Sequence, residues 1–512
     1  MTKQTKSIWI GTSPSSIYGP LKGKEKVDVI VIGAGMTGIS VALQLKLAGK
    51  TVAVIDQHSI GTGESGHTTA HITEILDSQY QKIQSDFGKK SATLVARAMQ
   101  AANEQIARWV EEWNIDCSYE KVPAFQYTES RKDIRSLKKE LAAFQKVGLT
   151  AKWQQTIPLP FETYGGIRIE DQAQFHPRKY LLALAKRIPG DGSHIFENTR
   201  ALEIKEGTPA HVVTEQGELF GQDLVVATNT PSVNRFFMHT KVAAYRTYAI
   251  ASPLDRPPLT KGLYWDTADP YHYIRSYDEV WIIGGEDHKT GMKTDTEECY
   301  LRLAEYTRSH FSGKSITDKW SGQIMDPVDG LPYIGLNPAS RHTYIATGFS
   351  GNGMTFGTLS GLLIPDLILK RDNPWAEIFS PKRINVVSSA MHFLAENKDY
   401  PVCLIKDHLL KTNTSKPEDV SNLPAGEGCV VNQNGQSIAV YRDKKSELHT
   451  VSAVCTHLGC QVHWNSSEKS WDCPCHGSRF STEGEVLNGP ATVGLHPVQY
   501  VAPQKDLKKS AA

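Results

Sequence analysis

The chain lacks any apolar run long enough to span a membrane, and it carries almost no net charge. A transmembrane helix needs about 18 or more consecutive apolar residues, and no such run occurs among the 512 residues. Lys plus Arg number 56 and Asp plus Glu 55, which gives a net charge of +1. This balance gives no reason to expect a nucleic acid as a partner or a stable insertion into a membrane.

The N-terminal stretch also lacks the features of an export signal, and cysteine is scarce. Residues 1–16 contain no long apolar core, small-residue cleavage site or twin arginine, so we expect a cytoplasmic protein. Four of the eight cysteines are scattered, as small buried hydrophobic residues often are. The other four lie between Cys455 and Cys475. This clustering indicates a site.

The stretch from Val27 to Asp56 has the pattern of a buried strand, a helix and a second strand. A G-x-G-x-x-G motif of Gly33, Gly35 and Gly38 lies between the first strand and the helix. Such glycines permit a tight turn, close approach of a pyrophosphate and close helix–strand packing, while the helix N-terminus attracts the phosphates. The acid that ends the second strand is placed to bind ribose hydroxyl groups. The stretch therefore predicts an adenine-dinucleotide site.

Two further segments suit the same ligand. Residues 61–73 are rich in glycine and hydroxyl groups, and their Thr68 and Thr69 are expected to lie against phosphate and a flat ring. A second glycine-rich turn, with Gly348, Gly351 and Gly353, opens a helix much later in the chain. A flavin with its ribityl chain is long enough to be held at both ends.

Residues 240–291 are rich in β-branched and aromatic residues, which predicts an antiparallel sheet on the substrate side of the cofactor. Alternate residues of a strand share a face, so Tyr271, Tyr273 and Arg275 are expected to project together. An arginine together with two tyrosines suits a substrate carboxylate, and it suits a surface ion pair equally well. Asp287 and His288, after the next strand, complete the candidate catalytic set.

The clustered cysteines include a C-x-H pair and a C-x-x-H pair. Cys455, His457, Cys473 and His476 offer two thiolates and two imidazoles from two loops. This donor set suits a 2Fe-2S cluster in which the cysteines bind one iron and the histidines the other. A structural zinc site and a disulfide-rich module are the alternatives.

The first 375 residues resemble the D-amino-acid oxidase-like flavoproteins. The matching segments are VIGAGMTGIS, LVVATNTP and GFSGNGMTFG. The resemblance implies FAD between a Rossmann-like domain and a substrate sheet, and oxidation of C–N bonds by hydride transfer. His67 and His71 lie near the positions where some relatives tether their flavin, but neither aligns cleanly. We therefore expect non-covalent FAD.

The C-terminal motifs resemble the Rieske iron–sulfur domain. This resemblance implies that Cys455, His457, Cys473 and His476 ligate the cluster, and that Cys460 and Cys475 form a disulfide that clamps the two ligand loops. The expected fold class is thus an α/β Rossmann-like FAD domain with an inserted antiparallel substrate sheet (α+β), followed by a small all-β Rieske domain. We expect the FAD domain in residues 1–375, a connector in 376–420 and the Rieske domain in 421–512.

A flavin takes two electrons as a hydride, whereas a 2Fe-2S cluster takes one. The combination predicts an FAD-dependent oxidoreductase, more a dehydrogenase than an oxidase, that oxidises a small amine or amino-acid-like donor. Single electrons would leave through the cluster to a carrier such as a ferredoxin, a cytochrome or a quinone. A reductase running in the opposite direction, and an electron-transfer or redox-sensing protein without small-molecule turnover, are the alternatives.

Phe480 yields a testable prediction about the cluster. Rieske proteins of the respiratory cytochrome bc complexes have a tyrosine at this position, whose hydroxyl donates to a ligand sulfur and stabilises the reduced state. A difference of about 1 kcal/mol corresponds to roughly 40 mV for one electron. We expect a potential in the middle of the Rieske range of about −150 to +300 mV. Phe480→Tyr should raise it by tens of millivolts in protein-film voltammetry. A wild-type potential at the top of the range would contradict this.

Overall fold

The computed structural model describes residues 6–230, 238–254, 258–311, 315–338, 340–383, 414–415 and 417–501. The chain divides into two compact units, Met1–Asp287 with Cys299–His392 and His288–Glu298 with Phe393–Ala512. It therefore passes between the units three times. Most of the predicted connector, residues 384–413, lies outside the described residues.

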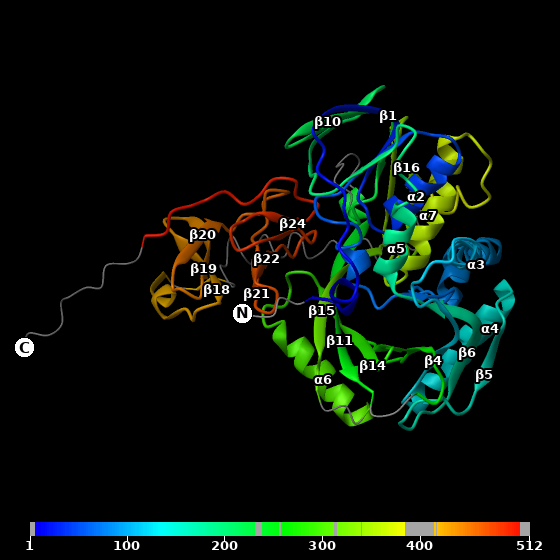
Figure 1. The fold of residues 1–512 in the computed structure, drawn as a ribbon. Coiled ribbons are helices and arrows are strands. Elements are labelled where there is room, and N and C mark those ends of the chain that lie inside the picture. The colour runs from blue at the N-terminus through cyan, green and yellow to red at the C-terminus, as the bar shows by residue number, and fades with distance from the viewer. Residues whose placement is uncertain are drawn as a thin grey trace, which may run out of the picture. The chain divides into compact units, whose positions relative to one another are not determined.

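An eight-stranded sheet organises the first unit (Figure 1). Its strand order is β16-β17-β10-β1-β2-β7, and β9 pairs with both β10 and β8. The central strands β17, β10, β1, β2 and β7 are parallel. Strands buried on both faces read as continuous β-branched runs, which explains the sequence of β1. The strands are β1 (Gly23–Ile32), β2 (Val52–Ile55), β7 (His194–Phe196), β8 (Ala201–Lys205), β9 (Ala210–Thr214), β10 (Gly217–Val226), β16 (Tyr333–Leu336) and β17 (Thr343–Thr347).

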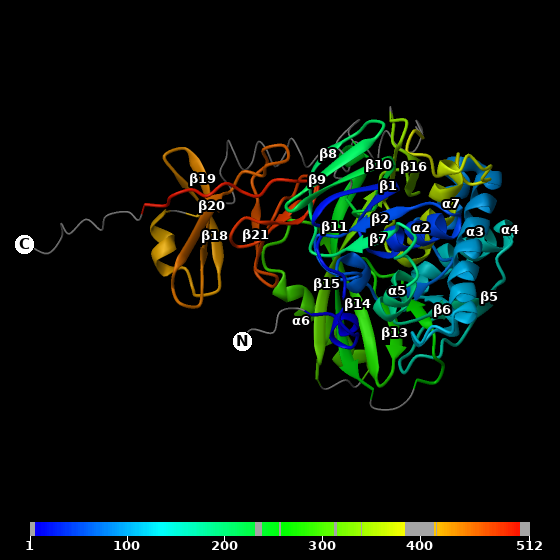
Figure 2. The ribbon, with the colours of Figure 1, turned by 45° about the horizontal axis from the view of Figure 1, so that its top comes forward.

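Helices α2 (Met36–Leu47) and α7 (Gly353–Ile368) pack side by side against this sheet, and α3 (Tyr80–Glu112) packs against α7 (Figure 2). Glycine in α7 allows the close crossing with α2, because a Cβ on Gly361 would lie 2.6 Å from the Cβ of Ser40. The smaller helices of the first unit are α1 (Ile8–Gly11), α4 (Ile134–Val147) and α5 (Pro177–Ala185).

The predicted substrate sheet is larger and more mixed than the sequence suggested. It has nine strands in the order β15-β11-β14-β13-β12-β4-β6-β3, with β5 paired to β6. Residues 240–291 supply only four of them, and β12 pairs in parallel with β4. The strands are β3 (His71–Ile72), β4 (Glu120–Tyr127), β5 (Ala151–Gln154), β6 (Gly166–Gln174), β11 (Val242–Pro253), β12 (Leu263–Trp265), β13 (Tyr273–Tyr277), β14 (Val280–Lys289) and β15 (Asp318–Pro327). Helix α6 (Glu297–Phe311) follows β14.

The second unit is built from two small antiparallel sheets, which confirms the predicted all-β domain. One contains β18 (Gly428–Gln433), β19 (Gln436–Arg442) and β20 (Leu448–Ser452). The other contains β21 (His463–Asn465), β22 (Ser470–Asp472), β23 (Arg479–Phe480) and β24 (Val486–Asn488). Trp471 and Phe480, both 0% exposed, belong to a core that also includes Cys455 and Cys473. The two loops that carry the predicted cluster ligands are therefore anchored in this core.

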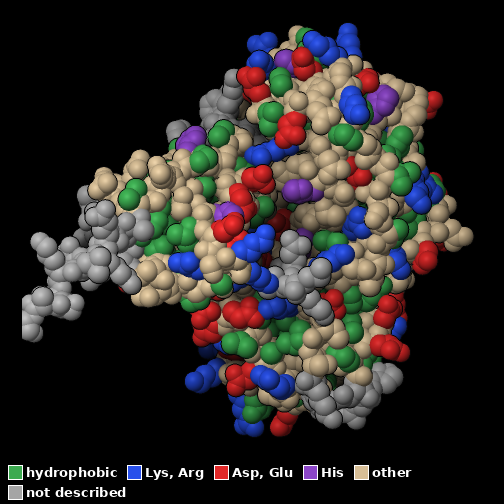
Figure 3. Space-filling view, turned by 60° about the vertical axis from the view of Figure 1, so that its left-hand side comes forward, with side chains coloured by type: hydrophobic (Ala, Val, Ile, Leu, Met, Phe, Trp, Pro, Cys, Tyr) green, Lys and Arg blue, Asp and Glu red, His purple; other side chains and the backbone are tan. Residues whose placement is uncertain are grey.

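No helix among the described residues combines the length and the apolar character needed to cross a bilayer. Acidic and basic side chains are interspersed on the face drawn in Figure 3, in keeping with the net charge of +1.

The crossing of α2 and α7 generates a prediction about stability. Gly361→Val should destabilise the first unit by about 1–3 kcal/mol, because the added carbons would overpack the contact with Ser40. Thermal unfolding should show a lower midpoint. Gly19→Val is the control, since Gly19 is exposed and no atom lies within 4 Å of its added Cβ. Equal midpoints for the two variants would contradict the close packing.

Candidate functional site

The turn between β1 and α2 is held by contacts between backbone atoms. Gly33 has a φ of 106°, and a Cβ there would lie 2.4 Å from the carbonyl oxygen of Ala227. A Cβ on Gly38 would lie 1.8 Å from the carbonyl oxygen of Gly33. Gly35 caps α2 without a side-chain hydrogen bond. The N–H of Met36, the first residue of α2, donates to Oγ of Ser65 at 2.9 Å, so the positive end of the helix dipole lies beside this hydroxyl group.

Asp56 lies beside this turn at the end of β2. Its Oδ2 accepts a hydrogen bond from the backbone N–H of Ala34 at 2.7 Å, and its Oδ1 accepts one from His58 at 2.8 Å. Burial raises the pKa of Asp56, and these two donors oppose the rise. Each carboxylate oxygen retains a lone pair for a ribose hydroxyl.

The hydroxyl-rich segment contains a 3₁₀ helix, Glu64–Gly66, and ends in β3 of the second sheet. The Oγ1 of Thr68 accepts a hydrogen bond from the N–H of Ala70 at 2.9 Å, and the Oγ1 of Thr69 lies 3.1 Å from Nδ1 of His71. His71 packs edge-on against Tyr273 with ring centroids 6.2 Å apart. Burial and the charge of Arg275 lower the pKa of His71 to about 3, so its imidazole is neutral.

The late glycine turn is fixed to the segment that follows β3. Gly348 has a φ of 77°, a left-handed conformation that favours glycine. The N–H of Gly351 donates to Oδ2 of Asp77 at 2.6 Å, and the side chain of Asn352 donates to the carbonyl oxygen of Ile75 at 2.7 Å. Gly353 then begins α7, which has no side-chain cap.

These features fit FAD at both ends. Two helix N-termini and glycine turns that leave no room for side chains suit a long dinucleotide. The residues that would hold it are those predicted from the sequence: Gly33, Gly35, Gly38, Asp56, Thr68, Thr69, Gly348, Gly351 and Gly353.

Tyr273, Thr247 and Asp287 form a hydrogen-bonded chain on the second sheet. The hydroxyl groups of Tyr273 and Thr247 lie 2.5 Å apart, and Thr247 also hydrogen-bonds to Asp287. The Oδ1 of Asp287 is shielded from solvent and makes no hydrogen bond with any described residue. Burial raises the pKa of Asp287 to about 7, and the nearby carboxyl groups of Asp326 and Asp77 add to the rise.

Backbone geometry directs these side chains. A Cβ on Gly284 would lie 2.0 Å from the ring of Tyr273, so this glycine is required for the ring to lie across β14. Glu286 then adopts a φ of 61°, a strained conformation for a residue other than glycine, and its carboxylate pairs with Arg302 at 2.9 Å. Strained backbone often marks a functional site, and here it directly precedes Asp287.

Tyr271 and Asp77 lie next to the hydrogen-bonded chain of Tyr273, Thr247 and Asp287. The rings of Tyr271 and Tyr273 are 5.8 Å apart, and Tyr271 hydrogen-bonds to Asp77. Desolvation by the surrounding protein raises the pKa of Asp77, and the hydrogen bonds from Gly351 and Tyr271 oppose the rise. The structure thus brings together the predicted Tyr271, Tyr273 and Asp287.

Arg275 and His288, the other two residues of the candidate catalytic set, do not belong to this cluster. Nη1 of Arg275 donates to the carbonyl oxygens of Thr69, Ala70 and Phe175 at 2.9–3.2 Å. Its guanidinium also lies 5.3 Å from the ring of Trp9, which is 0% exposed. Arg275 shares a strand face with Tyr273 but is held by backbone. His288 belongs to the second unit, where its Nδ1 lies 2.8 Å from the carbonyl oxygen of Lys289.

The sequence did not indicate Asp77, Thr247 and Asp326 as site residues. Their positions span two strands and a loop, and no local pattern connects them with β13 or β14. Only the folded sheet brings Thr247 to Asp287.

In the second unit the four predicted cluster ligands converge. Cys455 and Cys473 are buried, and their sulfur atoms are within hydrogen-bonding distance of one another. This shared hydrogen bond lowers the pKa of Cys455 to about 7 and raises that of Cys473. The rings of His457 and His476 are 5.0 Å apart, with their Nδ1 atoms shielded from solvent. Two thiols beside two imidazoles fit a Rieske cluster.

The predicted disulfide between Cys460 and Cys475 is confirmed, and it joins the two ligand loops across 15 residues of sequence. The sulfur of Cys473 lies within 4.8 Å of both disulfide sulfurs. Since the disulfide uses two of these three sulfur atoms, they do not form a separate metal site.

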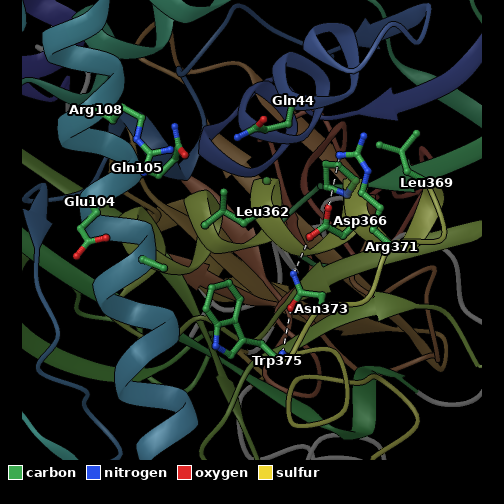
Figure 4. A pocket seen from close by; sticks show the side chains of 13 residues that line it. Gln44, Glu104, Gln105, Arg108, Leu362, Asp366, Leu369, Arg371, Asn373 and Trp375 are labelled. Atoms are coloured by element: carbon green, nitrogen blue, oxygen red, sulfur yellow. Dashed lines mark hydrogen bonds and ion pairs between the residues drawn. The ribbon is translucent and has the colours of Figure 1, made fainter.

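A pocket on the helical side of the first unit is distinct from these sites (Figure 4). Its volume is about 280 Å³, and it is lined by α2, α3, α7 and the turn after α7. Asp366 accepts a hydrogen bond from Asn373 at 3.0 Å there, and Trp375 forms part of the wall. Every predicted site residue lies outside its lining.

The fold and the two sites define an oxidoreductase that uses FAD together with a Rieske 2Fe-2S cluster. The family described as FAD dependent oxidoreductase matches residues 28–367, and the Rieske [2Fe-2S] domain matches residues 416–500. The chain belongs to the FAD dependent oxidoreductase family and carries a C-terminal Rieske domain.

Similar proteins share this organisation in whole or in part. The chain is 32% identical over 501 residues to YhfW of Bacillus subtilis, described as a Rieske 2Fe-2S iron-sulfur protein, and the match covers 96% of this chain and 97% of that protein. It is 23% identical to gamma-glutamylputrescine oxidoreductase of Escherichia coli, over 72% of this chain and 90% of that protein. The crystal structure of glycine oxidase from Geobacillus kaustophilus has a TM-score of 0.61 at 19% identity, over 70% of this chain and 99% of that one, which shows a shared fold.

The separate cores of the two sites generate a prediction. His476→Ala should abolish iron binding while the flavin absorbance remains, because the FAD-binding turns lie in the other unit. Iron and flavin analysis should give about two irons per FAD for the wild type and flavin alone for the variant. His496→Ala is the control, because His496 is an exposed residue of the same unit. Loss of flavin from His476→Ala would contradict the separation.

Proposed function

We propose that the protein is a dehydrogenase of a small amine that passes single electrons through its Rieske cluster to an external one-electron carrier. The observation that carries the substrate class is the cluster of Asp287, Asp77, Tyr271 and Tyr273. A buried carboxylate is stable when it faces an opposite charge. The cluster therefore favours a substrate with an ammonium group.

The surroundings of Arg275 favour the same substrate class. An arginine that binds a carboxylate in a bidentate manner needs two donors directed at the ligand. Arg275 is fully buried and its Nη1 is shared among three backbone carbonyls, so only Nη2 lacks a partner among the described residues. The carboxylate substrate that the Tyr-x-Tyr-x-Arg pattern suggests is thus less well supported than a simple amine. The relative named for γ-glutamylputrescine supports only the amine group, because that molecule carries a carboxylate as well as a primary amine.

Asp287 is assigned two roles. As a carboxylate it attracts and orients the ammonium group, and it then accepts a proton so that the nitrogen lone pair becomes available. Thr247 and Tyr273 hold this carboxylate through the hydrogen-bonded chain and supply a route for the proton. FAD, when bound, takes up the hydride from the carbon next to the nitrogen.

The Rieske cluster of the second unit is the reason for proposing a dehydrogenase rather than an oxidase. A Rieske cluster carries one electron at a time, so the two electrons of each oxidised amine can leave in single steps to two molecules of carrier. The acceptor could be a ferredoxin, a cytochrome or a quinone. The substrate becomes an imine, which water hydrolyses.

Anaerobic mixing tests the proposal. Amines and polyamines should bleach the flavin absorbance, and ferricyanide or cytochrome c should restore it. Amino acids and hydroxy acids of similar size are the comparison. Bleaching by hydroxy acids alone would contradict the amine assignment. No bleaching with any donor would indicate a carrier without its own substrate.

The raised pKa of Asp287 generates a prediction about pH. The proton-accepting form is the carboxylate, so kcat/KM should rise about tenfold per pH unit below pH 7 and level off above the pKa of about 7. Asp287→Asn should remove this ascending limb and lower kcat/KM by roughly 10²–10⁴-fold. Asp278→Asn, at the exposed turn between β13 and β14, is the matched control and should keep the wild-type profile. The same limb in both variants would exclude Asp287 as the base.

A further inference from the structure

Residues 288–298, here termed the bridging segment, belong to the iron–sulfur unit although their sequence lies inside the FAD dependent oxidoreductase match. The segment begins immediately after Asp287 on β14 and ends in the first turn of α6. It lies outside the Rieske match of residues 416–500. A Rieske domain defined by sequence alone therefore omits a part of this unit.

At one end, the bridging segment lies directly on a ligand loop. Gly291 has a φ of 73°, and a Cβ there would lie 2.7 Å from the nitrogen of Pro474 and 2.9 Å from the carbonyl carbon of Cys473. Backbone thus packs on backbone beside a cluster ligand. Nδ1 of His463 lies 2.7 Å from the carbonyl oxygen of Gly291, in a buried hydrogen bond.

At the other end, the segment is fixed to the hairpin that leads into this loop. Thr296 is 0% exposed, and its Oγ1 donates to Oδ1 of Asn465 at 2.7 Å and accepts from the N–H of Ser467 at 3.1 Å. The side chain of Asn465 in turn donates to Oδ2 of Asp472 at 2.8 Å. Asp472 is the last residue of β22 and directly precedes the ligand Cys473.

We propose that the bridging segment is a positioning element of the cluster, in which Gly291 sets the path of the Cys473–His476 loop and Thr296 anchors the hairpin beneath it. The buried hydrogen bonds and the contact too close for any side chain show that the segment is built into the unit. Its ends are covalently joined to β14 and α6, so a displacement of β14 at Asp287 can be transmitted along the chain to the ligand loop. This inference does not depend on the substrate proposed above.

The test compares two glycines with the same backbone conformation in the full-length protein. Gly435, with a φ of 83°, also belongs to the iron–sulfur unit, but no atom lies within 4 Å of its added Cβ. Gly291→Ala should change the EPR spectrum of the reduced cluster and shift its reduction potential, or lower its iron content, while the flavin spectrum is retained. Gly435→Ala carries the same backbone strain and should match the wild type. Indistinguishable EPR spectra and potentials for the two variants would overturn the proposal.

Thr296→Val tests the role of the bridging segment if Gly291→Ala does not fold. It keeps the volume of the side chain and removes only the hydroxyl group, which leaves Asn465 and the N–H of Ser467 without this partner. We expect the cluster absorbance to be lost at a lower temperature than in the wild type, with flavin release unchanged. An unaltered temperature of cluster loss would overturn the role of the segment.

Discussion

The first unit depends on the direct contact between the backbones of β1 and α2. With the α-carbon of Gly38 against the carbonyl of Gly33, the helix cannot carry a side chain at this point without moving away from the sheet. The same contact places the N-terminus of α2, with the hydroxyl of Ser65 on its first N–H, where a pyrophosphate would bind. α7 then packs on α2 through Gly361 and brings the second glycine turn to the same sheet. The close packing of β1 on α2, and of α2 on α7, thus positions both ends of the proposed FAD site.

In the candidate active site, carboxyl groups lie where desolvation makes their charged form unfavourable. Asp287 is desolvated, and Asp77 and Asp326 repel its charge, so the site holds more negative charge than it can stabilise alone. Such an arrangement is maintained only by the rigid sheet around it. A cationic ligand would relieve the repulsion, which links the instability of the free site to its selectivity. In the iron–sulfur unit, by contrast, the thiols of Cys455 and Cys473 lie within an apolar core.

Local spacing in the sequence was sufficient to predict the G-x-G-x-x-G turn and the donor set of the cluster motifs. The disulfide was predicted from the resemblance of these motifs to the Rieske domain, and the structure contains it. The sequence was insufficient where partners come from distant strands. Nothing near Thr247 indicates a bond to Asp287, and a strand pattern that groups Arg275 with Tyr273 cannot reveal that backbone carbonyls bind its Nη1. The bridging segment has no sequence signature either, because Gly291 resembles any turn glycine until its neighbours are known.

The burial of Trp9 has a consequence for how the protein is made. Its ring packs on Tyr277 and Arg275 of β13, which are synthesised long after it. Synthesis at about 5–20 residues per second therefore leaves the indole without these partners for on the order of tens of seconds. The contacts that bury Trp9 thus form only after β13 has been made.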